Sequence, residues 1–117
     1  MAGMLYLVPT PIGNLGDISK RARETLESAD FIAAEDTRVT LKLLNHLELK
    51  KPLVSYYEHN KSFKGEKILD RILAGETCAL VSDAGSPAIS DPGEDLVKQC
   101  AAAGIPVCAI PGPCAAI

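Results

Sequence analysis

The sequence predicts an α/β fold in which a mostly parallel, five-stranded sheet is flanked by helices. Short apolar runs rich in branched residues alternate with stretches whose apolar residues recur at helical spacing. The 117 residues, 47% of them hydrophobic, are enough for one compact domain with its own core. Parallel strands joined by helices place their functional loops at the carboxyl ends of the strands.

The first strand and helix are predicted within residues 4–29. Residues 4–8 form a continuous apolar run that stops at Pro9, as in a strand buried on both faces. The next stretch has apolar residues at intervals of four, four and three, with Asp17 placed to cap the first helical turn. These apolar residues are Ile18, Ala22, Leu26 and Ala29.

The middle of the chain predicts a strand at 31–34, a helix from about Thr37 and a strand at 53–57. A Lys-Pro pair at 51–52 separates this helix from the strand at 53–57. One face of this helix is expected to carry Leu41, Leu44 and Leu47.

The last third predicts a helix, a strand at 77–82, a helix at 94–103 and a strand at 106–110. Gly75 and Gly104 follow the two helices and suit left-handed C-terminal caps. The apolar stripe of the first of these helices consists of Ile68, Leu69, Ile72 and Leu73.

Composition and terminal sequences limit the class of protein. Twelve Lys and Arg against fifteen Asp and Glu leave a net charge of −3, which offers no general positive field for a polyanion. No apolar run approaches the roughly 20 residues that cross a bilayer, and the start resembles no secretory signal. The four cysteines form no C-x-x-C pair. We therefore expect a cytoplasmic protein with reduced cysteines and no cysteine metal site.

The two ends of the chain predict its place in a longer protein. Residues 110–117 are small and apolar, unlike the polar tails that exposed termini usually carry. We expect residues 1–117 to be the N-terminal domain of a longer protein whose C-terminal domain is absent here. Met4 offers an alternative natural start, in which case residues 1–3 are a cloning scar.

Two of the predicted loops could hold a ligand with backbone amides. Residues 9–17 combine two prolines with Gly13 and Gly16 but match neither G-x-G-x-x-G nor G-K-[ST], so a rigid turn remains the alternative. Residues 80–93 contain two Asp, three Ser, two Gly and two Pro directly after a buried strand. A loop of this length usually wraps around or covers something. Asp83 and Asp91 lack supporting ligands at metal-site spacing, so no metal is expected.

Two further loops carry candidate catalytic groups. In Glu-Asp-Thr-Arg at 35–38, Asp36 or Thr37 could simply cap the following helix, while Arg38 could pair with a carboxylate or hold a phosphate. In Ser-Tyr-Tyr-Glu-His-Asn at 55–60, His59 could exchange a proton near neutrality or be an ordinary surface residue.

Five motifs in this order resemble the ribosomal RNA small subunit methyltransferase I family, of the tetrapyrrole methylase-like superfamily. They are T-P-I-G-N-L-x-D, E-D-T-R, Y-x-E-H-N, S-D-A-G-S-P-x-I-S-D-P-G and P-G-P, and they span nearly the whole chain. The resemblance implies a homodimeric enzyme of two α/β domains, with S-adenosylmethionine in the cleft between them. The implied substrate is the ribose 2′-hydroxyl of a cytidine in small-subunit (16S) ribosomal RNA.

The resemblance also implies residues for the cofactor pocket, which it would line largely through backbone groups. Cys114 stands where the family often has Ser, and a thiol is the weaker hydrogen-bond donor. Pro9 stands where the family often has Ala. The implied cofactor-binding residues are Pro11, Ile12, Gly13, Asp83, Ser86, Ile89, Cys114 and Ala115.

The chemistry of methyl transfer suggests roles for the remaining loop residues. A ribose hydroxyl must lose its proton, and His59, Glu35 and Asp36 are the loop residues able to accept it. Arg38 and Asn60 would position a phosphate or the ribose. Two other functions stay open: a tetrapyrrole methyltransferase with the same fold and cofactor, and a non-catalytic nucleotide-binding module. In any enzymatic case we expect the isolated domain to be inactive, because half of the cleft is missing.

Overall fold

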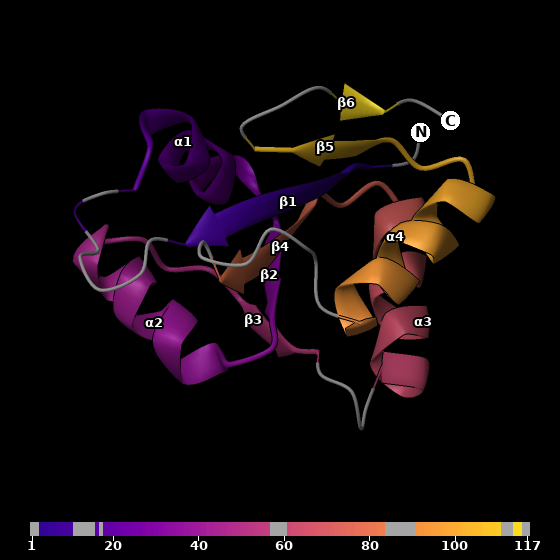
Figure 1. Cartoon of the computed structure of the whole chain (residues 1–117), viewed down its shortest axis with the longest axis horizontal. Helices are drawn as coiled ribbons and strands as arrows, with labels where there is room; N and C mark the ends of the chain where they lie inside the picture. Colours follow the sequence, from indigo (N-terminus) through magenta and orange to yellow (C-terminus); the bar gives the residue numbers. More distant parts are fainter. Residues whose placement is uncertain are drawn as a thin grey trace.

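A computed structural model describes residues 3–10, 16, 18–56, 61–83, 91–110 and 114–115. One sheet lies at the centre of the molecule, with α1 and α2 on one side and α3 and α4 on the other (Figure 1). The strands are β1 (Leu5–Thr10), β2 (Phe31–Ala34), β3 (Leu53–Ser55), β4 (Cys78–Asp83), β5 (Val107–Ala109) and β6 (Cys114–Ala115). The helices are α1 (Lys20–Ser28), α2 (Thr37–His46), α3 (Lys61–Leu73) and α4 (Asp91–Ala102).

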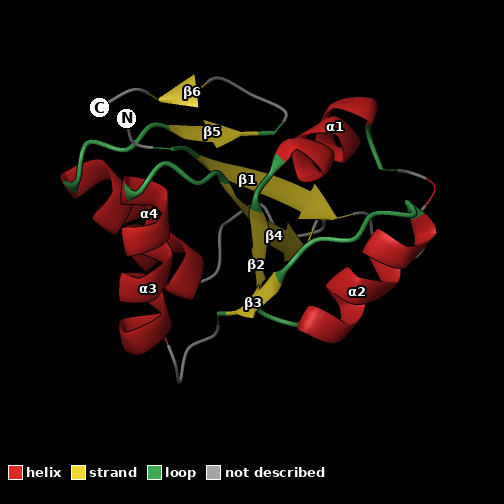
Figure 2. Cartoon of the chain, turned by 180° about the vertical axis from the view of Figure 1, so that it is seen from behind, coloured by secondary structure: helices red, strands yellow, loops and turns green. Residues whose placement is uncertain are grey.

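The strand order in the sheet is β3-β2-β4-β1-β5-β6. Strands β1 to β5 run parallel, as the sequence predicts, and β6 pairs antiparallel with β5. β4 lies between β1 and β2 and is hydrogen-bonded to both (Figure 2). The fold class is confirmed, and β6 is an additional strand that the sequence did not reveal.

Strand alternation divides the core into two apolar layers. Leu80 of β4 packs among buried residues from α3 and α4, whereas its neighbour Val81 packs among buried residues from α1 and α2. Buried strands with both faces covered must be apolar throughout, which explains the continuous runs in β1, β2 and β4. The helices therefore leave the strand ends as the part of the sheet where a ligand can reach the backbone.

Helix ends follow the predicted capping chemistry with one correction. The N-cap of α1 is Ser19, whose Oγ accepts a hydrogen bond from the amide of Ala22 at 3.1 Å, and not the predicted Asp17. After α3 and α4, Gly75 and Gly104 adopt φ of 109° and 76°, the left-handed conformation predicted for them.

The buried face of α2 differs from the predicted one. Leu44 and Leu47 are buried as expected, but Leu41 is 50% exposed and Leu43 is fully buried in its place. Thr40 completes the buried face, and its Oγ1 donates a hydrogen bond to the carbonyl of Asp36 at 3.3 Å. The helix is therefore rotated away from the orientation that the leucine spacing suggested.

The cysteines also require a correction. Cys78 and Cys100 are free and buried, and burial raises the pKa of both thiols, that of Cys100 to about 11. Cys108, in contrast, is disulfide-bonded in the structure, against the expectation of four reduced cysteines. The register places Cys108 of β5 opposite Cys114 of β6, a proximity that could not be read from the sequence because β6 was not predicted.

An ion pair at the amino end of the sheet joins Arg71 of α3 to Glu76, which lies between α3 and β4. Arg71 donates two hydrogen bonds to Glu76, from Nε to Oε2 at 2.9 Å and from Nη2 to Oε1 at 2.8 Å. Its guanidinium carbon lies 3.8 Å from the centre of the Phe31 ring, which is fully buried. The bidentate contact lowers the pKa of Glu76 below its usual value.

Candidate functional site at the carboxyl edge of the sheet

The connections of β1 and β4 leave these adjacent strands in opposite directions. β1 is followed by α1 and then by β2 on one side, whereas β4 is followed by α4 and then by β5 on the other. The last residues of the two strands, Thr10 and Asp83, are register partners. In open α/β sheets a ligand binds outside the carboxyl ends of the strands at such a switch point. This point is therefore the candidate site.

The two motif-rich segments of the sequence start at this switch point. Residues 11–15 follow Thr10 and residues 84–90 follow Asp83, so both segments leave the sheet from neighbouring positions. Seven of the predicted site residues lie outside the described residues. These are Pro11, Ile12, Gly13, His59, Asn60, Ser86 and Ile89.

Three of the other predicted site residues belong to strands. Asp83 ends β4 at the switch point, whereas Cys114 and Ala115 form β6, which β5 separates from β1. The sheet thus places Asp83 at the predicted edge and β6 two strands away from β1. Their predicted contacts with a cofactor remain predictions.

The Glu-Asp-Thr-Arg motif joins β2 to α2 at the same edge. Asp36 is the N-cap of α2, and its Oδ1 accepts a hydrogen bond from the amide of Arg38 at 3.0 Å. This backbone hydrogen bond is the main reason that the pKa of Asp36 is lowered. The capping interpretation of Asp36 is confirmed, and the lowered pKa makes this carboxylate a weaker proton acceptor.

Glu35 and Arg38 are both exposed at this edge. The Arg38 side chain is 89% exposed, and its Nε lies 3.4 Å from Oδ1 of Asp36. An exposed pair at this distance is weak, so the guanidinium can exchange its partner for an incoming anion. The motif therefore presents one weakly paired cation and one carboxylate without a partner among the described residues, both beside the switch point.

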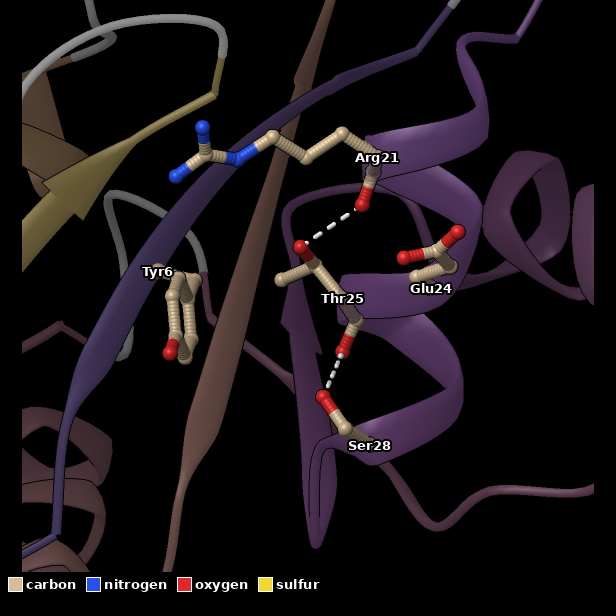
Figure 3. Close-up of a pocket in the computed structure, with 5 residues that line it drawn as sticks. All are labelled: Tyr6, Arg21, Glu24, Thr25 and Ser28. Atoms are coloured by element: carbon tan, nitrogen blue, oxygen red, sulfur yellow. Dashed lines mark hydrogen bonds between the residues drawn. The ribbon is translucent and has the colours of Figure 1, made fainter.

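A shallow pocket of about 330 Å³ lies elsewhere, between β1 and α1 (Figure 3). Tyr6 contributes from β1, and four residues of α1 form the rest of its lining. Thr25 Oγ1 donates to the carbonyl of Arg21 at 2.8 Å, and Ser28 Oγ donates to the carbonyl of Thr25 at 3.1 Å. The helix backbone already occupies these hydroxyl protons, and the pocket lies beside Tyr6 near the amino end of β1, away from the switch point, so it is not the candidate site.

Two further findings concern metal ligands and membrane-spanning helices. Within the described ranges, no group of three or more His, Cys, Asp or Glu side chains is arranged to hold a metal ion. The described helices include none with the length and apolar character needed to span a membrane.

One residue near this edge, Lys42, was not among the site residues predicted from the sequence. Lys42 follows Arg38 by four residues on α2 and is exposed on the same face of the helix. The i, i+4 spacing of two cations on a helix without acidic residues is the signal that could have identified it.

Comparisons with known proteins agree with the fold and the motifs. Residues 4–117 match the family model described as Tetrapyrrole (Corrin/Porphyrin) Methylases. A protein named ribosomal RNA small subunit methyltransferase I from Synechocystis sp. is 55% identical over 115 residues, 98% of this chain and 41% of the relative. The protein of the same name from Halalkalibacterium halodurans is 58% identical over 98% of this chain and 40% of its own length. The predicted resemblance is thereby confirmed.

The likeness to solved structures concerns the fold. Uroporphyrin-III-C-methyltransferase from Thermus thermophilus superposes with a TM-score of 0.71 at 23% identity, over 96% of this chain and 48% of that one. The chain spans about two fifths of the length of the curated relatives named above. Since the family match extends over residues 4–117, from before β1 to the last residue, the chain belongs to the tetrapyrrole (corrin/porphyrin) methylase family.

Proposed function

We propose that this chain is the N-terminal domain of a two-domain, S-adenosylmethionine-dependent methyltransferase. Its substrate is the ribose 2′-hydroxyl of a cytidine in small-subunit ribosomal RNA. The observation that carries the proposal is the identity of 55% and 58%, over 115 residues, to two relatives named ribosomal RNA small subunit methyltransferase I. In this proposal the full-length protein works as a cytoplasmic homodimer, and the second domain completes the cofactor cleft.

The residue types at the switch point suit S-adenosylmethionine, which carries a sulfonium and an amino group. Residues 82–93 contain two aspartates and no lysine or arginine, so the segment favours cations. The bound cofactor supplies the methyl group. The residues that would hold it are Pro11, Ile12, Gly13, Asp83, Ser86, Ile89, Cys114 and Ala115.

The loops after β2 and β3 would serve the acceptor. Positioning can contribute much of the rate when the nucleophile is held in line at about 3 to 3.5 Å. Glu35 and His59 are the stronger candidates for accepting the hydroxyl proton, because capping lowers the pKa of Asp36. Arg38 and Asn60 would hold a phosphate or the ribose.

The test uses the full-length protein, labelled S-adenosylmethionine and small ribosomal subunits that lack the modification. Label on a cytidine ribose is the expected result, with none from residues 1–117 alone. Label on a base, or no label on RNA, would refute the proposal. Loss of S-adenosylmethionine binding as well would favour a non-catalytic nucleotide-binding module.

Two variants then separate the candidate bases. We expect Glu35→Gln or His59→Ala to lower kcat about 100-fold or more if that residue accepts the proton. Glu27→Gln is the matched control for Glu35, since it makes the same change at an exposed position of α1. Near-normal turnover of a variant would eliminate its residue as the base.

A tetrapyrrole methyltransferase is the second candidate. The matched family model is described by tetrapyrrole methylation, and the Thermus thermophilus neighbour is named for it. Methyl transfer to a porphyrin-type acceptor, without label on ribosomal RNA, would favour this function.

A further inference from the structure

The outward face of α2 has an unusual charge for this chain. Residues 37–46 include Arg38 and Lys42 and no acidic residue, although the chain as a whole carries a net charge of −3. Two cations of other helices pair with acidic residues: Lys20 lies 3.9 Å from Glu24 on α1, and Arg71 of α3 pairs with Glu76. The described part of the chain thus has a local cationic surface on α2.

The packing of α2 fixes which residues form this surface. Leu43 and Leu44 are buried against the sheet, which turns the positions about half a turn away toward solvent. Arg38, Lys42 and Asn45 lie along the centre of that exposed face, and His46 borders it. Both overall views place α2 at the periphery of the molecule (Figures 1 and 2).

The surface begins at the candidate site and leads away from it. Arg38 lies in the first turn of α2, directly after the carboxyl end of β2. Asn45 follows seven residues later, which is about 10 Å along the helix axis. Because Arg38 has only a weak contact with Asp36 and Lys42 has no ion pair among the described residues, both cations are accessible to phosphate groups.

We propose that Lys42 and Asn45, with Arg38, bind successive phosphates of the RNA strand that carries the nucleotide to be methylated. This inference rests on the proposed function. A chain with a net negative charge needs such a local surface to hold a polyanion near its active site. Val39 and Leu41, at 46% and 50% exposure, flank the polar centre of the face, so a protein ligand is the alternative occupant that the test must detect.

The test compares Lys42→Ala with Lys98→Ala in the full-length protein. Lys98 is an exposed lysine of α4, on the opposite side of the sheet, so the control removes the same charge far from the proposed surface. Both positions are on helices, where alanine is favourable, and binding of S-adenosylmethionine checks the fold of each variant. The measured quantity is the affinity for small ribosomal subunits as a function of salt concentration.

Loss of one phosphate contact should reduce the slope of log K against log salt by about 0.7 and weaken binding about fivefold at 0.1 M salt. We expect this change, with a raised KM for RNA, from Lys42→Ala and not from Lys98→Ala. Equal slopes and affinities for the two variants would overturn the inference. Weaker binding of Lys42→Ala without a change of slope would also overturn it, in favour of a protein ligand.

Methylation by the wild-type protein keeps the two proposals apart. If the wild type labels RNA and Lys42→Ala behaves like Lys98→Ala, the inference fails and the proposed function stands. If the wild type labels no RNA, the proposed function is refuted and the inference with it.

Discussion

The orientation of α2 can be tested with two leucines that lie two residues apart. Leu43 is fully buried, whereas Leu41 is 50% exposed. Leu43→Ala removes a buried side chain and leaves a cavity, so we expect the free energy of unfolding to fall by about 3 to 4 kcal/mol. Leu41→Ala leaves no cavity and exposes little apolar surface, so its expected cost is under about 1 kcal/mol.

Urea unfolding of the 117-residue chain, followed by far-ultraviolet circular dichroism, measures both values. The two substitutions are chemically identical and share one helix, so helix propensity cancels in the comparison. An equal cost at both positions, or a larger cost at Leu41, would refute the orientation. Since Arg38 lies only about 60° from Leu41 around the helix, a larger cost at Leu41 would also bring Arg38 to the border of the buried face.

Three further predictions concern a turn, an ion pair and the buried thiols. Gly104→Ala should lower the free energy of unfolding by about 1 kcal/mol because φ is 76° there, although no atom lies within 4 Å of the added Cβ; an unchanged stability would contradict the left-handed conformation. The contact with Arg71 lowers the pKa of Glu76 in the folded state, so the stability that Glu76 contributes is present above its unfolded pKa and is lost as pH falls through the folded pKa. Glu76→Gln should therefore flatten the pH dependence of the urea midpoint below about pH 4.5. An unaltered profile would argue against the Arg71 contact. In the native chain Cys78 and Cys100 should resist alkylation at pH 8 and react once urea unfolds it, and mass spectrometry that finds rapid labelling of the folded protein would contradict their burial.

An element of the fold was predictable from the sequence where its local residue pattern allowed one structure alone. The buried run of β1 and the glycines after α3 and α4 are of this kind. In α2, three leucines and the C-cap Leu47 offer two overlapping faces, and the choice depends on how Thr40 and Leu43 meet the sheet. β6 has only two residues and no periodicity, so its pairing with β5 depends on tertiary structure.

The candidate site was predictable in its position more than in its detail. Loop composition located the segments after β1, β2 and β4, and the switch point lies where the first and last of these begin. The strand order that creates the switch point could not be read from the sequence, because a parallel strand can pair on either side of its neighbour. Lys42 lies inside α2, beyond the loop that carries the Glu-Asp-Thr-Arg motif, so loop composition gave no signal for it.

The central position of β4 has a consequence for the synthesis of the chain. Both sheet neighbours of β1, namely β4 and β5, come later in the sequence. At about 5 to 20 residues per second, a ribosome takes roughly 4 to 15 s to extend the chain from the end of β1 to the end of β4. During that interval Leu5 and Val8, fully buried in the finished fold, have no strand beside them. β1 therefore cannot take its place in the sheet until synthesis has reached residue 83, whereas β2 and β3 can pair earlier.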